Sequence, residues 1–285
     1  MMTRILFLLS LVLGSTILLT GAWTGSLSNP PQQAEPAFVP QALPLEADII
    51  GSGVDARQLL QKALEKLDPQ RTAWLKTKIR QTMTDADSNF VAEGFLQRGP
   101  NHCAHLEMDI VTGGKQGRLL IVSDGEIIAQ VSEVPGADPT TDVANFPNAV
   151  EGSPSKKLAV KEKFLCGKSC GGPGALLELL QPHLQNARLQ TGILHKTPVI
   201  QIKGDLNANW ASANVGTKTP VQQACVYLDA KTLWPQRIEW WGVDMTNSPR
   251  RVLCIEFLEP EFLRELSIDE CVRMFSYKPS HEPID

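Results

Sequence analysis

Histidine and cysteine are the side chains with the most reactive chemistry in this sequence, and their spacing decides what they could do. The chain has five histidines, His102, His105, His183, His195 and His281. None of them lies in a His-Glu-x-x-His zinc motif. His102 and His105 flank Cys103, yet on a strand these two histidines project from opposite faces. We therefore expect a protein that is not an enzyme and that holds no metal and no cofactor.

The cysteines favour structural disulfides. There are six of them, Cys103, Cys166, Cys170, Cys225, Cys254 and Cys271. An even set of cysteines is typical of disulfide-bonded proteins in an oxidising compartment. Cys166 and Cys170 lie amid glycines, which favours a local disulfide; a redox or metal-binding pair is the alternative, although the spacing is not Cys-x-x-Cys. Cys103 and Cys254 alternate with apolar neighbours, so we expect their thiols on the outer face or the rims of a sheet.

The first 23 residues are a targeting or anchoring segment. Arg4 precedes a mostly apolar run about long enough to cross a bilayer, so residues 1–23 are either a signal peptide or an uncleaved transmembrane anchor. Residues 24–50 are rich in proline and predict an extended linker. No cysteine precedes Cys103, so acylation of this chain itself is not expected. We expect the chain in the periplasm or cell envelope, with anchoring to the inner membrane as an open alternative.

Residues 51–285 predict one folded domain. The chain is 42% hydrophobic, which is enough for a sizeable core. Its formal net charge is -4 and it has no long basic run, so nucleic acid is excluded as a partner. We expect a monomer.

Most of this domain has the apolar alternation of strands. Strands are expected at 75–83, 90–97, 103–111, 118–123, 127–134, 189–195, 198–203, 222–228, 236–241, 251–257 and 272–277. Asp124-Gly125 is the strongest hairpin signal. Short connections predict an antiparallel sheet and exclude a nucleotide-binding βαβ array. Residues 135–156 show no period and predict a loop.

Three helices are expected beside the strands, at 55–67, 175–180 and 261–266. Asp55 is a good N-cap for the first helix, and Asp68-Pro69 ends it. The second helix is apolar on most of its sides because of Leu176, Leu177, Leu179 and Leu180. A helix of this composition must cover an apolar surface.

The order of four short motifs resembles the Lol carrier superfamily (LolA-like and LolB-like proteins), which ferries lipoproteins between bacterial membranes. The block Val91–Asn101 leads to Leu-Ile-Val-Ser-Asp-Gly at 120–125, Val226–Asp229 precedes Leu233–Glu239, and Phe275–Pro279 matches the closing strand. The resemblance implies an α+β fold: an incomplete antiparallel β-barrel, or curved sheet, lidded by short α-helices around an apolar cavity for acyl chains.

The resemblance also implies which residues form the site. Arg98 matches an arginine that hydrogen-bonds the lid and controls its closure, although Gly99 here separates it from Pro100; a solvated charge at a hairpin end is the alternative. The expected cavity and lid residues are Leu106, Met108, Ile110, Trp240, Leu176, Leu177, Leu179 and Leu180. Plain core packing is the alternative for the lid leucines.

Two functions follow as hypotheses. The first is a carrier or chaperone of the envelope that holds acyl chains of lipoproteins or lipids in an apolar cavity. The second is a membrane-tethered sensor or interaction module of the same fold that detects mislocalised envelope proteins. An uncleaved N-terminal segment favours the second, because a shuttle must diffuse between membranes.

Overall fold

The computed structural model describes residues 37–43, 55–67, 75–85, 89–99, 103–133, 139–145, 172–207, 210–211, 219–244, 246–262 and 266–276. The predicted signal or anchor at 1–23 and the pair Cys166 and Cys170 lie outside the described residues. Within these ranges no helix has both the length and the apolar character needed to span a bilayer.

The described strands form one antiparallel sheet of twelve strands. They are β1 (Val39–Pro40), β2 (Leu75–Thr84), β3 (Asn89–Arg98), β4 (Cys103–Thr112), β5 (Lys115–Asp124), β6 (Ile127–Glu133), β7 (Thr140–Asn145), β8 (Leu184–Leu194), β9 (Thr197–Leu206), β10 (Val221–Asp229), β11 (Pro235–Val243) and β12 (Pro249–Phe262). Their order is β1-β8-β9-β10-β11-β12-β2-β3-β4-β5-β6-β7, so among the described strands β1 and β7 are the two edges and the barrel is incomplete. The predicted fold class is confirmed.

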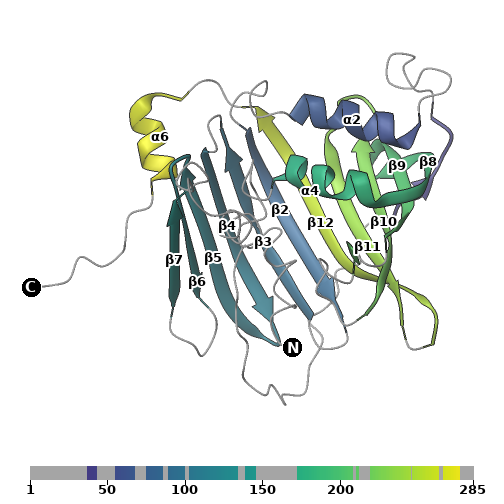
Figure 1. Cartoon of the computed structure of the whole chain (residues 1–285), viewed down its shortest axis with the longest axis horizontal. Helices are drawn as coiled ribbons and strands as arrows, with labels where there is room; N and C mark the ends of the chain where they lie inside the picture. The colour runs from purple at the N-terminus through teal and green to yellow at the C-terminus, as the bar shows by residue number, and fades with distance from the viewer. Residues whose placement is uncertain are drawn as a thin grey trace, which may run out of the picture.

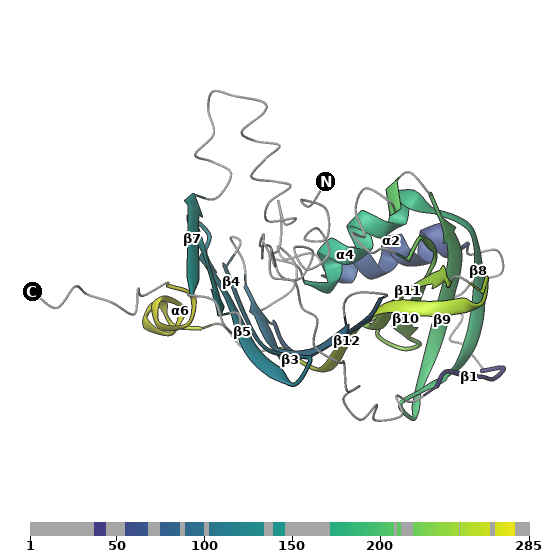
Figure 2. The ribbon, with the colours of Figure 1, turned by 90° about the horizontal axis from the view of Figure 1, so that it is seen from below.

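The sheet is strongly curved, and two helices lie on its concave side (Figure 1, Figure 2). These helices are α2 (Ala56–Leu67) and α4 (Pro173–Leu180), and the short 3-10 helix η2 (Gln181–His183) follows α4. Two of the hairpins turn where glycine adopts positive φ, at Gly113 and Gly114 between β4 and β5 and at Gly125 between β5 and β6. Asp124-Gly125 is therefore the hairpin turn that its sequence predicted.

Alternate residues of each strand face the concave side and form one apolar core with the helices. In β2 the inward residues are buried and most of their neighbours are not, as a half-buried strand requires. The stripe of α2 that faces the sheet consists of Leu59, Leu60, Ala63 and Leu67, all buried. The core is thus assembled from both halves of the curved sheet.

The C-terminal elements differ from the prediction. The strand expected at 272–277 is wrong, because Ile268–Phe275 forms helix α6. The helix expected at 261–266 is wrong at its start, since β12 continues through Phe262. The Ser267 hydroxyl accepts from the Glu270 N–H, and the Glu270 carboxylate accepts from the Ser267 N–H; this capping box starts α6.

Helix α6 lies on the convex side of β4 and β5 (Figure 2). It is held there by His105, whose Nδ1 donates to the Met274 carbonyl oxygen at 2.9 Å. This position covers the outer face of the sheet, opposite α2 and α4.

Two further strands lie in segments that were expected to be irregular. The loop predicted at 135–156 is wrong over Thr140–Asn145, because this segment pairs with β6 as edge strand β7. An edge strand gains backbone hydrogen bonds without an apolar period, and Thr140, Thr141 and Val143 are β-branched. Val39–Pro40, inside the predicted linker, pairs with β8.

Candidate ligand-binding site

The concave face brings the predicted cavity residues into one apolar cluster. Leu106 and Met108 of β4 are 1% and 0% exposed, and Ile110 is partly buried against the same cluster. Trp240 of β11 joins the cluster from the other half of the sheet, whereas Trp241 belongs to the convex side. The alternation of these strands is sufficient to explain the grouping, because residues two apart share a face.

Helix α4 covers part of this concave face. It begins after Gly172 with Pro173 at a position where no backbone donor is needed. All four predicted lid leucines pack on the core: Leu176, Leu177 and Leu180 are fully buried, and Leu179 is partly buried. Gln181 at the end of α4 donates to the Gln61 side chain of α2 at 3.2 Å, so the two helices are joined.

Arg98 connects the sheet to α2 and lies beside Gly172, the residue before α4. It is the last residue of β3, it is 5% exposed, and its Nη2 donates to the carbonyl oxygen of Leu67 at 2.8 Å. Leu67 is the last residue of α2, where helix carbonyls lack backbone partners and a cation is favourable. A Cβ at Gly172, just before α4, would lie 3.0 Å from Arg98 Nη1. The alternative of a solvated charge is wrong, because Arg98 is buried.

The concave face also contains polar atoms without a hydrogen-bond partner. Over the part of the chain that the structure describes, both amide atoms of Gln81 and the indole Nε1 of Trp240 are buried and unpartnered, and so is Oε1 of Gln130. Gln81 is 1% and Trp240 is 0% exposed, and both side chains share the face of the apolar cluster. Each unsatisfied buried polar group costs about 1–3 kcal/mol, so these atoms need an explanation. Sequence reasoning selected Trp240 but missed Gln81, although Gln81 alternates in phase with the inward residues Ile79 and Met83 and this phase was the signal that could have found it.

The convex face of β10–β12 buries charges instead, and every one of them has a partner. Arg237 Nε donates to Glu256 Oε1 at 2.9 Å, and Arg237 Nη1 donates to Glu239 Oε1 at 3.4 Å. Tyr227 donates its hydroxyl to Glu239 Oε2 at 3.0 Å, and His195 Nε2 lies 2.8 Å from Glu256 Oε1. Burial alone would raise the pKa of Glu256, but the charge and hydrogen bonds of Arg237 and the contact with His195 outweigh it and lower that pKa.

Disulfides are not formed among the described cysteines. Cys103, Cys225, Cys254 and Cys271 are free thiols, which corrects the prediction for these four. Cys225 and Cys254 share one row of the sheet, but Glu239 lies between them in that row. Two strand spacings separate their Cα atoms by about 9–10 Å, beyond the reach of a disulfide. Cys103 and Cys254 do lie off the apolar concave face, as expected.

The thiols of Cys103 and Cys225 are also poor nucleophiles. Burial, together with the nearby Cys271 and Asp124, raises the pKa of Cys103 to about 11. Burial and the carboxylate of Glu239 raise the pKa of Cys225 to about 12. Because the thiolate is the reactive form, neither thiol is activated for catalysis at neutral pH.

One short sequence matches a hydrolase pattern by letter. Residues 167–171 spell Gly-Lys-Ser-Cys-Gly, which fits Gly-x-Ser-x-Gly, and they lie outside the described residues. In an α/β-hydrolase, that motif forms the sharp turn between a strand of the sheet and the helix that follows it. The sheet here is antiparallel between all its paired strands, so the architecture that the motif requires is not the one observed.

Comparisons with known proteins give similarity at the level of the fold. No family model matches the chain, and no curated protein matches it significantly. Among solved structures, Mycobacterium tuberculosis lipoprotein LppX is 13% identical over 71% of this chain and 94% of its own, with a TM-score of 0.41. LprF from Mycobacterium bovis is 11% identical over 71% and 90%, with a TM-score of 0.41. A LolA superfamily protein from Nitrosomonas europaea is 9% identical over 76% and 97%, with a TM-score of 0.24. Each of these three structures is covered over at least nine tenths of its own length, at an identity of 13% or less.

Proposed function

We propose that this chain binds the acyl chains of lipoproteins or lipids on its concave face, beneath α2 and α4, as a carrier or chaperone of the cell envelope. The observation that carries the proposal is Arg98, a buried cation that joins the end of β3 to the last carbonyl of α2 beside the start of α4. This bond can hold α2 against the apolar sheet, and α4 is joined to α2 through Gln181 and Gln61, so the two helices can move together.

The strength of such binding follows from the apolar area. Burying one methylene contributes about 0.8 kcal/mol, so about ten buried methylenes contribute roughly 8 kcal/mol. That value corresponds to a dissociation constant of about 1 μM, which suits a protein that must also release its ligand.

The unpartnered atoms define a polar part of the ligand. Trp240 Nε1 can only donate, and the Gln81 amide can donate and accept. The ester or amide carbonyl at the head of an acyl chain accepts hydrogen bonds, so an acyl chain with its linkage satisfies both the apolar face and these atoms. A plain hydrocarbon leaves both side chains unpartnered.

Movement of α2 away from the sheet requires that the hydrogen bond from Arg98 to the Leu67 carbonyl oxygen breaks. A hydrogen bond to a charged group contributes about 1.5–3 kcal/mol, which a partner protein or a membrane surface can supply. This is the step at which a carrier would load or discharge its ligand.

The proposal is tested by a matched pair of neighbouring residues. Ile110 and Val111 of β4 are similar in size and both partly buried, but Ile110 packs on the concave cluster and Val111 faces the other way. The measurement is fluorescence titration of a fatty acid probe with a sixteen-carbon chain. Ile110→Asp is expected to weaken binding more than tenfold, and Val111→Asp less than twofold. Equal losses in both variants, or no binding by the original protein, would overturn the proposal.

The choice between a shuttle and a tethered module rests on the N-terminal segment. Intact-mass measurement of the mature protein from its host gives the answer: loss of about the first 23 residues supports a diffusible carrier. A retained segment supports the tethered sensor or interaction module, with the same acyl site.

A further inference from the structure

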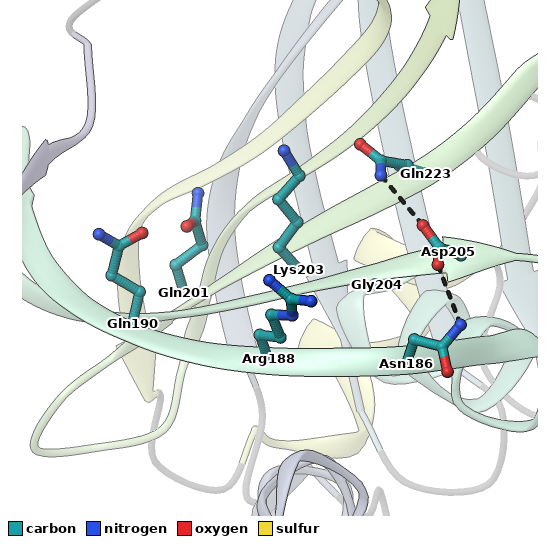
Figure 3. A pocket seen from close by; sticks show the side chains of 8 residues that line it. All are labelled: Asn186, Arg188, Gln190, Gln201, Lys203, Gly204, Asp205 and Gln223. Carbon is teal, nitrogen blue, oxygen red and sulfur yellow. Dashed lines mark hydrogen bonds between the residues drawn. The ribbon is translucent and has the colours of Figure 1, made fainter.

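A polar hollow of about 410 Å³ lies on the convex side of β8, β9 and β10, away from the concave face. Its walls are Asn186, Arg188, Gln190, Gln201, Lys203, Gly204, Asp205 and Gln223. Figure 3 shows that the long side chains of Arg188 and Lys203 extend into the same space from neighbouring strands. Because its residues face the opposite side of the sheet, this hollow does not depend on the acyl-binding proposal.

The hollow is formed by an irregularity that the sequence specifies. The pairing of β8 with β9 shifts register between Gln185 and Arg188, and Asn186 has φ of 49°. Such bulges change the direction in which side chains project. Opposite the bulge, a Cβ at Gly204 would lie 2.8 Å from the Gln185 carbonyl oxygen, so only glycine allows this close approach.

Two cations face each other across this hollow. Arg188 and Lys203 are directly opposite in the antiparallel register. Like charges in this position destabilise a sheet, because their side chains are neighbours. Both side chains are exposed, and over the part of the chain that the structure describes neither has a carboxylate within ion-pair distance.

The one acid in the hollow does not neutralise the pair by direct contact. Asp205 accepts from Asn186 Nδ2 at Oδ2, 3.1 Å away, and from Gln223 Nε2 at Oδ1, 3.0 Å away. These two hydrogen bonds, and then the charges of Arg188 and Lys203, lower the pKa of Asp205. Asp205 therefore stays ionised and bound to amides at one end, while Gln190 and Gln201 form the opposite pair at the other end.

We propose that this hollow binds a phosphate group between Arg188 and Lys203. A phosphate offers several oxygens to the fork of an arginine and to the point charge of a lysine, and it removes their mutual repulsion. The volume admits a group larger than a carboxylate. The phosphate comes either from a lipid headgroup or from free phosphate, since the chemistry of recognition is the same.

The first test uses inorganic phosphate and thermal unfolding of the full chain at low ionic strength. Phosphate is expected to raise the melting temperature of the original protein, and the double variant R188Q/K203Q is expected to lose at least nine tenths of that shift. Without phosphate, the double variant should melt at or above the original temperature, because the repulsion is gone. Lys231→Gln, at an exposed turn, is the matched control and should keep the full shift.

The second test separates the two sources. Flotation with vesicles of phosphatidylcholine alone and with added phosphatidylglycerol reports binding to a lipid headgroup, and inorganic phosphate serves as the competitor. Flotation that needs the anionic lipid and is lost in R188Q/K203Q assigns the site to a headgroup. A phosphate shift without flotation assigns it to free phosphate. An equal shift in the original protein and the double variant, together with equal flotation, overturns the proposal.

Discussion

Two groups of deeply buried polar side chains, one on each face of the curved sheet, differ in their hydrogen bonding. On the convex side, Arg237, Glu239 and Glu256 are each about 2% exposed, and each is bonded to another member of the group. On the concave side, Gln81 and Trp240 are as deeply buried, but the amide atoms of Gln81 and the indole nitrogen of Trp240 have no hydrogen-bond partner among the described residues. Both faces belong to one sheet with one pairing pattern, so backbone geometry does not cause the difference.

The comparison teaches how to separate structural polar residues from those that await a ligand. A buried charge that has partners stabilises the folded state, because removing one partner leaves the opposite charge buried without compensation. A buried amide or indole without a partner lowers stability as long as it stays alone. Removing a partnered buried group should therefore lower stability, and replacing an unpartnered one with an apolar side chain should raise it.

The largest effect is expected from Arg237→Met on the convex face. It leaves Glu239 and Glu256 buried without their shared cation, which costs about 3–5 kcal/mol. Urea unfolding measures this as a lower midpoint. Arg251→Met is the control, because Arg251 also bonds Glu239, at 3.3 Å, but is partly exposed, and about 1 kcal/mol or less is expected. If the two variants unfold at the same midpoint, the convex network is not a structural unit.

A smaller effect is expected from Arg98→Leu, which removes the link between the sheet and α2. The loss is about 1.5–3 kcal/mol, because the bond to the Leu67 carbonyl has a charged donor. Hydrogen exchange should be faster in the last turn of α2 and the first turn of α4, while β9 and β10 keep their protection.

Arg98→Lys is the matched control for the link, since it keeps the charge but shortens the reach. It should give an intermediate exchange rate in α2. Unchanged exchange in both variants would mean that Arg98 does not hold the helices. If Arg98→Leu binds the acyl probe faster than the original protein, the bond from Arg98 to α2 limits access to the concave face.

A gain of stability is expected from Gln81→Leu on the concave face. Replacing an unpartnered buried amide by an apolar side chain of similar size raises the free energy of unfolding by about 1–2 kcal/mol. Thr77→Val, on the same face of β2, is the control. It should lower the free energy of unfolding, because the Thr77 hydroxyl donates to the Leu258 carbonyl oxygen at 2.8 Å. A loss of stability in Gln81→Leu would remove the contrast between the two faces.

The alternation of apolar residues was enough to predict most of the sheet and the concave cluster. Leu106, Met108 and Ile110 share a face because side chains alternate along a strand, whatever covers them. Helix α6 was missed because its apolar residues were interpreted with a period of two. The Ser267 and Glu270 spacing of a capping box was the signal that could have found it.

The convex features could not be predicted, because they depend on partners across strands. Arg237, Glu239 and Glu256 alternate like residues of a solvated face, and only the register places them together. The opposition of Arg188 and Lys203 depends on the bulge in β8, and a shift of one residue would send these side chains to the other face. The unpartnered state of Gln81 is likewise a property of its neighbours in space.

The smallest effect is expected from acid, and it comes from the lowered pKa of Glu256 in the convex network. The pKa of Glu256 is lower in the folded chain than in the unfolded chain. Its contribution is therefore fully present above the unfolded pKa of about 4.3 and is lost as the pH falls through the folded pKa. Urea midpoints measured from pH 6 down to pH 3 should fall less steeply in Glu256→Gln than in the original protein. Glu259→Gln, which removes an exposed carboxylate paired with Lys78, should follow the original slope. If Glu256→Gln follows it as well, the convex charges do not stabilise the fold through their ionised form, and the two faces differ less than their hydrogen bonds indicate.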